Sequence, residues 1–321
     1  MSVGSEVRGR VGHLRLERDG ALNALTVDMI RALAAGLERH AGDGDVEAIV
    51  VSSSDPRAFS AGGDMKRVRE LVLGADFEPV DAFFREEYAL NLAIARCPKP
   101  YVALIDGIAM GGGLGISVHG SHRVMTENAR VAMPETRLGL FPDVGGTHFL
   151  PRLAHRAGWW LALAAETLGG AEAVAVGLGT HLVPAESLPA LVEALETGGD
   201  EVDAAIEAHA APVDDPDFAE RLERRARWFA GDDLARIEGD LAGVAGLDEE
   251  ARRLLERVRS ASPFAIDATL KLFEGSLERD LEATLIREFA AVREAVRHPD
   301  FAEGVRAALV DKDGEPAWAG R

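Results

Sequence analysis

The stretch YVALIDGIAMGGGLGISVHGSHRVMTENARVAMPETRLGLFPD, residues 101–143, decides the fold. It begins with five apolar residues, Tyr101–Ile105, which predict a buried strand. A turn at Asp106 and Gly107 comes next, then three glycines at 111–113, and then apolar residues at helical spacing. Because a strand, a glycine-rich turn and a helix follow one another, this stretch predicts part of an α/β core.

The same alternation continues on both sides. Residues 11–16 and 46–51 predict strands, and Thr26 can cap a helix that follows it. Residues 81–97 predict another helix, and residues 180–183 predict a last short strand. The alternation of strands and helices therefore predicts the α/β class for this part of the chain.

The remainder of the chain has a different pattern. From Leu188 onward, the spacing of apolar residues predicts helices almost throughout, with a break rich in Pro and Asp at 212–216. We therefore expect two parts, an α/β core over residues 1–187 and a helical region over residues 188–321.

The composition is that of a globular protein with a strong acidic excess. The formal net charge is −19, which argues against nucleic acid and against an anionic membrane as partners. No apolar run reaches the roughly 18 residues that span a bilayer, and the N-terminus has no apolar signal core. We therefore expect a cytoplasmic protein. Cys97 is the only cysteine, so no disulfide framework is expected.

Two glycine-rich turns are candidates for anion binding. They are Ala61-Gly62-Gly63-Asp64 and Gly111–Gly113, and each follows a strand and precedes a helix. Backbone N–H groups at such a turn can bind a negative charge, and two converging donors would form an oxyanion hole. Neither turn is followed by the residues of a Walker loop or of a dinucleotide fingerprint. The pattern alone is equally compatible with phosphate binding or close backbone packing.

Three carboxylates lie near these turns in the sequence. Glu135 and Asp143 have mostly apolar neighbours, which predicts partial burial and a raised pKa suited to a base or a nucleophile. A loop carboxylate is also commonly a cap. Glu87 lies on the helix at 81–97, where the simple interpretation is a solvated face. The nine histidines show no metal-ligand spacing, so no metal site is expected.

Together these residues resemble the crotonase, or enoyl-CoA hydratase/isomerase, superfamily over nearly the whole chain. The stretches that carry this resemblance are Leu22-Asn-Ala-Leu25, Ala58-Phe-Ser-Ala-Gly-Gly-Asp64, Gly107-Ile-Ala-Met-Gly-Gly-Gly113 and Pro134-Glu135. The resemblance implies a ClpP-like spiral fold of repeated ββα units with a helical C-terminal region that completes an acyl-CoA site.

The resemblance also implies roles for individual residues. The backbone N–H groups of Gly63 and Gly112 would hold the thioester carbonyl. The CoA part of the substrate would lie near the turn of Asn23, Ala24 and Leu25 and near Ala61, Asp64 and Lys66, as these positions match the family's CoA-binding segments.

Within the superfamily the chain is most similar to the 3-hydroxyisobutyryl-CoA hydrolases. The stretches concerned include Phe84-Arg-Glu-Glu-Tyr88, Met110-Gly-Gly-Gly-Leu-Gly-Ile-Ser-Val-His-Gly120, Gly139-Leu-Phe-Pro-Asp-Val-Gly-Gly146 and Asp300-Phe-Ala-Glu-Gly-Val-Arg306. This similarity implies that Glu135 and Asp143 are the catalytic and acyl-binding carboxylates and that Glu87 borders the acyl pocket.

One position separates this chain from typical hydratases. Hydratases of the family that it resembles typically carry a first catalytic Glu two residues after the GGG run. This chain has Gly115 at that position. A single Glu beside an oxyanion hole is sufficient for thioester hydrolysis, as nucleophile or as general base. The glycine at 115 therefore favours hydrolysis over hydration. The resemblance implies that the substrate is a short-chain 3-hydroxyacyl-CoA, namely 3-hydroxyisobutyryl-CoA, and that the reaction is a step of valine breakdown.

Two alternatives stay open at this point. One is an enoyl-CoA hydratase or isomerase that uses Glu135 with Asp143, because isomerisation needs only one base. The other is a catalytically silent CoA-binding protein. No cofactor is expected, since coenzyme A is part of the substrate, and a homo-oligomer, either a trimer or a hexamer, is an expectation from the family.

Overall fold

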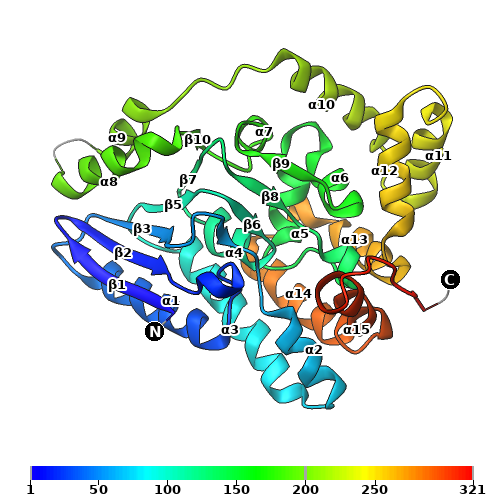
Figure 1. The fold of residues 1–321 in the computed structure, drawn as a ribbon, viewed down its shortest axis with the longest axis horizontal. Coiled ribbons are helices and arrows are strands. Elements are labelled where there is room, and N and C mark those ends of the chain that lie inside the picture. The colour runs from blue at the N-terminus through cyan, green and yellow to red at the C-terminus, as the bar shows by residue number, and fades with distance from the viewer. Residues whose placement is uncertain (1, 199–200, 320–321) are drawn as a thin grey trace. The chain divides into compact units, whose positions relative to one another are not determined.

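Two sheets and a long run of helices make up the chain in the computed structural model, which describes residues 2–198 and 201–319 (Figure 1). Within these residues the contacts group into two units. The first unit comprises Met1–Gly63, Glu86–Val131 and Leu168–Asp214. The second unit comprises Asp64–Arg85, Ala132–Thr167 and Asp215–Arg321.

The larger sheet belongs to the first unit and has the strand order β1-β2-β3-β5-β7-β10. Its strands are β1 (Val3–Arg8), β2 (Val11–Leu16), β3 (Ala48–Ser53), β5 (Tyr101–Ile105), β7 (His122–Met125) and β10 (His181–Leu182). Only β1 runs antiparallel to its neighbour, and the other pairs are parallel. The central strand β5 is buried at every position, which explains why its sequence is a continuous apolar run.

Helices cover this sheet and bury its apolar residues. Helix α1 (Val27–Gly42) packs on β1, β2 and β3 with an apolar stripe. It begins where expected, because the Thr26 side chain accepts a hydrogen bond from the N–H of Met29 at 3.3 Å. Helices α8 (Leu188–Thr197) and α9 (Val202–His209) contribute Leu191 and Ile206 to one cluster with the sheet residues Val50 and Val102.

A second, four-stranded sheet has the order β4-β6-β8-β9. Its strands are β4 (Ala58–Ser60), β6 (Ile108–Met110), β8 (Arg130–Ala132) and β9 (Thr167–Gly169). Strands β4 and β6 are parallel neighbours, so their carboxyl ends meet at one edge. The two glycine turns leave the sheet at this edge. The pairing therefore places the turns beside each other.

The remaining helices in the first half of the chain are short apart from α3. They are α2 (Met65–Leu73), α3 (Phe77–Ala95), α4 (Gly112–Val118), α5 (Gly146–Phe149), α6 (Ala157–Ala164) and α7 (Gly170–Ala175). The helix expected at 81–97 begins earlier, at Phe77, because Pro79 fits the first turn, where its missing N–H leaves no intrahelical bond unmade.

The C-terminal half of the second unit is helical, as expected. Its helices are α10 (Pro216–Trp228), α11 (Leu234–Val244), α12 (Glu249–Ser260), α13 (Pro263–Phe273), α14 (Leu281–Ala295) and α15 (Pro299–Val305). Helix α13 is capped by Ser262, whose hydroxyl accepts from the N–H of Ala265 at 3.1 Å. The α/β class with a helical C-terminal region is therefore confirmed. Each of the two units contains segments from before and after residue 187, so this grouping does not follow the expected division there. The division at residue 187 stays a prediction.

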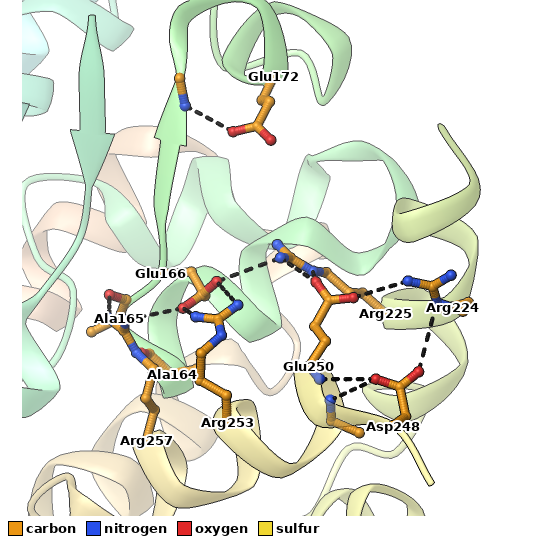
Figure 2. Close-up of polar contacts among 12 residues, drawn as sticks. Ala164, Ala165, Glu166, Glu172, Arg224, Arg225, Asp248, Glu250, Arg253 and Arg257 are labelled. Atoms are coloured by element: carbon orange, nitrogen blue, oxygen red, sulfur yellow. Dashed lines mark hydrogen bonds and ion pairs between the residues drawn. The ribbon is translucent and has the colours of Figure 1, made fainter. Parts of the chain in front are cut away.

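An ion-pair network around the buried Glu166 links α10 and α12 to the end of α6 (Figure 2). Glu166 is 4% exposed and receives two hydrogen bonds from Arg253, at 2.7 and 3.1 Å, and an ion pair from Arg257 at 3.1 Å. Arg225 on α10 pairs with Glu250 on α12. Because each buried charge has partners of opposite sign, α10 and α12 are held to the end of α6.

Candidate active site

The two glycine turns of the first unit are in contact. Gly62 has a φ of +97°, and a Cβ added there would lie 2.8 Å from the Met110 carbonyl oxygen and 3.4 Å from the Gly112 nitrogen. A Cβ added at Gly112 would lie 3.3 Å from the Gly63 nitrogen. The structure thus brings together the two backbone N–H groups predicted as oxyanion donors, and only glycine leaves room for this approach.

Glu87 lies against the same two turns. Its Oε1 atom occupies the place where a side chain at Gly112 would begin, and its side chain is 2% exposed. The expectation of a solvated helix face at this position is wrong, because the inward face of α3 carries Glu87 between the buried residues Phe84 and Leu90. Glu86 is the half-buried neighbour, and it accepts from Arg31 at 2.6 and 2.7 Å.

The turn predicted to hold the CoA part is fixed by the side chain of Asn23. Asn23 is fully buried, accepts from the Arg18 N–H at 2.7 Å and donates to the Ser53 hydroxyl at 2.7 Å and the Phe59 carbonyl at 3.0 Å. These bonds tie the turn to β3 and β4. The backbone of Asn23 is used as well, since its N–H donates to the Arg18 carbonyl at 3.1 Å and its carbonyl accepts from the Ser60 hydroxyl at 2.9 Å. Asn23 therefore fixes the turn, and its part in ligand binding stays a prediction.

The other predicted residues of this turn lie beside the glycines. The Leu25 N–H donates to the Gly62 carbonyl at 2.7 Å, and Leu25 bridges to Gly63 in parallel fashion. Ala61 donates to the Leu22 carbonyl at 2.9 Å. Ala24 is half-buried, and its carbonyl accepts from the Arg18 guanidinium at 2.7 Å. Arg18, which sequence reasoning missed, thus places a positive charge at the predicted CoA turn, an arrangement suited to phosphate.

Asp64 and Lys66 belong to the second unit. The Asp64 side chain caps α2 by accepting from the Arg67 N–H at 3.2 Å. Lys66 lies exposed in the first turn of the same helix. The role of both residues in substrate binding stays a prediction.

Glu135 begins a short 3-10 helix, Glu135–Leu138, and is 5% exposed. The C-terminal helices of the second unit support this turn closely. The N–H of Ser262 donates to the Thr136 carbonyl at 3.0 Å, and Gly139, with a φ of +72°, lies against the backbone of Asp300. Any side chain at Gly139 would collide with that backbone. The position of Glu135 therefore depends on α15 and on the start of α13.

Asp143, also 5% exposed, lies in a turn that a second buried carboxylate holds. Val144 and Gly145 have φ values of +53° and +80°. Glu288 on α14 accepts from the Gly145 N–H at 2.7 Å, from the Thr147 N–H at 2.9 Å and from the Thr147 hydroxyl at 2.6 Å. Three donors from the turn that directly follows Asp143 thus converge on the Glu288 carboxylate.

Burial gives Glu288 unusual electrostatics. The side chain is 0% exposed, and this desolvation raises its pKa to about 8, with the nearby charge of Asp143 acting in the same direction. The three donors act in the opposite direction, because they stabilise the anion. Sequence reasoning missed Glu288. The signal that could have found it is its spacing with Leu285, Val292 and Ala295, an otherwise apolar stripe.

Within the residues that the structure describes, no group of three His, Cys, Asp or Glu side chains could hold a metal ion, and no helix is long and apolar enough to cross a membrane. Gly115 is buried inside α4, among residues that carry no carboxylate.

Comparison with protein families places this geometry in a known context. A family model described as "Enoyl-CoA hydratase/isomerase" matches residues 11–321. The chain is 40% identical to the mitochondrial 3-hydroxyisobutyryl-CoA hydrolase of Mus musculus, covering 98% of this chain and 83% of that protein. It is 38% identical to the human protein of the same name, with the same coverage of both chains.

Solved structures show the same fold. A carnitinyl-CoA dehydratase from Mycobacterium thermoresistibile has a TM-score of 0.92 and 34% identity, covering 99% of this chain and 91% of that chain. An enoyl-CoA hydratase from Rhodobacter sphaeroides 2.4.1 has a TM-score of 0.88 and 36% identity, covering 99% and 92%. These similarities confirm the expected crotonase fold.

Proposed function

The chain belongs to the enoyl-CoA hydratase/isomerase family, and from this premise we propose that it hydrolyses 3-hydroxyisobutyryl-CoA to 3-hydroxyisobutyrate and CoA. The observation that carries the proposal is identity of 38 to 40% to hydrolases of this name over 98% of the chain. The contact between the Gly63 and Gly112 turns supports it, because acyl transfer requires donors at the carbonyl oxygen.

The proposal assigns a role to each predicted site residue. The N–H groups of Gly63 and Gly112 stabilise the tetrahedral oxyanion, an effect worth about 3–4 kcal/mol per donor. In one route Glu135 attacks the carbonyl and forms an anhydride while CoA leaves as the thiolate, and water then cleaves the anhydride to release the hydroxy acid and the Glu135 carboxylate. In the other route Glu135 takes a proton from a water molecule that attacks the carbonyl, and CoA leaves as the thiolate. Asp143 and Glu87 position the short hydroxyacyl group. These roles come from the family resemblance, and no cofactor takes part.

A hydratase or isomerase is the second candidate. Two of the most similar solved structures are titled as a dehydratase and a hydratase, at 34 and 36% identity. Against hydration stands Gly115, which leaves α4 without the first carboxylate of typical hydratases. Isomerisation needs one base only, so this position does not distinguish isomerisation from hydrolysis.

Two assays on one protein preparation separate the candidates. Purified protein is incubated with 3-hydroxyisobutyryl-CoA, and free thiol is followed. A second sample receives crotonyl-CoA, and loss of the enoyl absorbance is followed. Thiol release from the first substrate supports the hydrolase, whereas enoyl turnover without thiol release would overturn it. Turnover of neither substrate would favour the silent CoA-binding protein.

The Glu135→Gln variant tests the proposed catalytic carboxylate. We expect thiol release to fall by at least about 10³-fold with CoA affinity unchanged, because the amide can neither attack nor accept the proton at neutral pH. Glu70→Gln, on the outer face of α2, is the matched control and should keep the full rate. A Glu135→Gln protein that hydrolyses at the wild-type rate would show that the role is wrongly assigned.

Three further expectations stay proposals of the same kind. The reaction places the protein in valine breakdown. A cytoplasmic location is expected from the sequence, although the relatives named above are mitochondrial by name, and cell fractionation would decide it. A trimer or hexamer is expected from the family, and light scattering of the purified protein measures it.

A further inference from the structure

A buried amide on α3 has no partner in the fold. Asn91 is 0% exposed, and neither its Oδ1 nor its Nδ2 atom has a hydrogen-bond partner among residues 2–198 and 201–319. Burying an amide without hydrogen-bond partners destabilises the folded state. A group of this kind is retained in a fold when something outside the polypeptide completes its hydrogen bonds, either a water molecule or a ligand.

The position of Asn91 points to the acyl end of the candidate site. Asn91 follows Glu87 by four residues, so the two side chains share one face of α3, about 6 Å apart along the axis. Side chains on a helix lean toward its N-terminus, so the Asn91 amide lies over the turn that carries Glu87. Glu87 in turn lies against Gly112, beside the Gly63 nitrogen.

The buried residues next to Asn91 along α3 are apolar or aromatic. Tyr88, Leu90 and Ile94 on the same part of α3 are all less than 5% exposed. An amide in such surroundings can donate one hydrogen bond and accept another, which matches a hydroxyl group. A hydroxyl on the third carbon of an acyl chain lies within a few ångströms of the thioester carbonyl. The amide therefore has the chemistry and the placement to recognise it.

We infer that Asn91 binds the 3-hydroxyl of the acyl group and selects hydroxyacyl over plain acyl thioesters. The inference deepens the proposed function and rests on it for the position of the thioester carbonyl. Recognition of the hydroxyl by Asn91 needs no charge on the acyl group, since a neutral amide supplies both a donor and an acceptor. Loss of the amide should therefore affect discrimination between acyl chains rather than the chemical step.

The test compares two substrates that differ by one hydroxyl. Asn91→Leu keeps the side-chain size and removes the unpartnered polar atoms, so we expect the variant to fold at least as stably as the wild type. The ratio of kcat/KM for 3-hydroxyisobutyryl-CoA to that for isobutyryl-CoA should fall at least about tenfold. Ala89→Leu introduces the same residue on the exposed face of the same helix and should leave the ratio unchanged.

A second measurement separates this inference from the proposed function. Affinities for both thioesters are measured by calorimetry in the Glu135→Gln background, with and without Asn91→Leu. A binding ratio that falls with Asn91→Leu supports the inference even if the wild type releases no thiol, which would defeat only the hydrolase proposal. An unchanged ratio, an equal loss for both thioesters as expected of a structural water, or no binding of either thioester would overturn it.

Discussion

At Gly112 the absence of a side chain allows the Glu87 carboxylate and the Gly63 amide to approach the same point. A Cβ there would collide with Glu87 Oε1 and would lie 3.3 Å from the Gly63 nitrogen. The backbone at Gly112 itself is not left-handed, since its φ angle is not positive. The requirement for glycine at 112 is therefore one of space at the site and not one of backbone conformation.

Gly112→Ala is expected to fold and to lose activity. Gly112 is the first residue of α4, where alanine is tolerated, and the added methyl displaces the buried Glu87 carboxylate and narrows the approach to the Gly63 N–H. We expect thiol release from 3-hydroxyisobutyryl-CoA to fall roughly 10²–10³-fold, as for loss of an oxyanion donor, with little change in thermal stability.

The matched control is Gly239→Ala on α11. A Cβ at Gly239 would have no atom within 4 Å, so this variant should keep full activity and gain some helix stability. Equal kinetics for Gly112→Ala and Gly239→Ala would show that the carbonyl does not bind at the glycine turns.

Single residues show where the sequence was informative and where it was not. The glycine turns, Glu135 and Asp143 could be identified because each lies in a short local motif. The apolar stripe of α14 could have marked Glu288 as buried, but its role could not be predicted, because its donors come from a turn 141 to 143 residues earlier in the chain and no local pattern encodes that contact. For Glu87 the helical pattern alone favours a solvated face, whereas the family resemblance implies a place at the acyl pocket, and the structure shows a buried side chain.

At the scale of elements, α14 supports the Asp143 turn through one carboxylate. Val144 and Gly145 both have left-handed φ values, and the N–H groups of Gly145 and Thr147 donate to Glu288. An amide in place of the carboxylate would have to present an NH₂ group to one of these donors. The turn and the helix are therefore coupled by the charge state of Glu288.

Glu288→Gln is expected to make stability less dependent on pH. Burial raises the folded pKa of Glu288 from 4.5 to about 8, so between these values the folded state holds a proton that the unfolded state releases. The contribution of Glu288 to the free energy of unfolding of the wild type is fully present below about pH 4.5. It falls by up to about 1.4 kcal/mol per pH unit as the pH rises toward 8. Urea unfolding at pH 5 and pH 8.5 measures it.

The comparison with a surface carboxylate of the same helix makes this result specific. Glu294→Gln changes the same chemical group on the exposed side of α14 and sets the baseline for the pH series. The difference in unfolding free energy between the wild type and Glu288→Gln should become less favourable to the wild type as pH rises. A difference that stays constant with pH would mean that Glu288 remains ionised throughout.

Elements with clear periodicity were predicted well, and short or exposed ones were not. Strand β5 and helix α1 bury continuous or periodic apolar residues, and both were predicted. Strand β1 was missed because only Val3 is buried in it, so its sequence has no alternation to detect. The three-residue strands β4 and β6 are too short for any period, and their pairing depends on the rest of the sheet.

At the scale of the whole molecule, the acidic excess opposes both folding and substrate binding. The chain has 54 acidic and 35 basic residues, and coenzyme A carries negative phosphates as well. The buried Glu166 network gathers arginines in the second unit, and Arg18 places one at the predicted CoA turn of the first. The remaining surface carries a net negative charge, whose self-repulsion acts over about 30 Å at low salt.

Moderate salt should therefore stabilise the protein. Between about 10 mM and 150 mM NaCl the screening length falls from roughly 30 to 8 Å, which weakens the repulsion more than it weakens the partly buried ion pairs. We expect the melting temperature to rise by a few degrees, measured by calorimetry. A variant in which the exposed Glu38, Glu201 and Glu294 are all changed to Gln should respond less. A melting temperature that falls with NaCl would mean that ion pairs, the Glu166 network among them, outweigh the net charge.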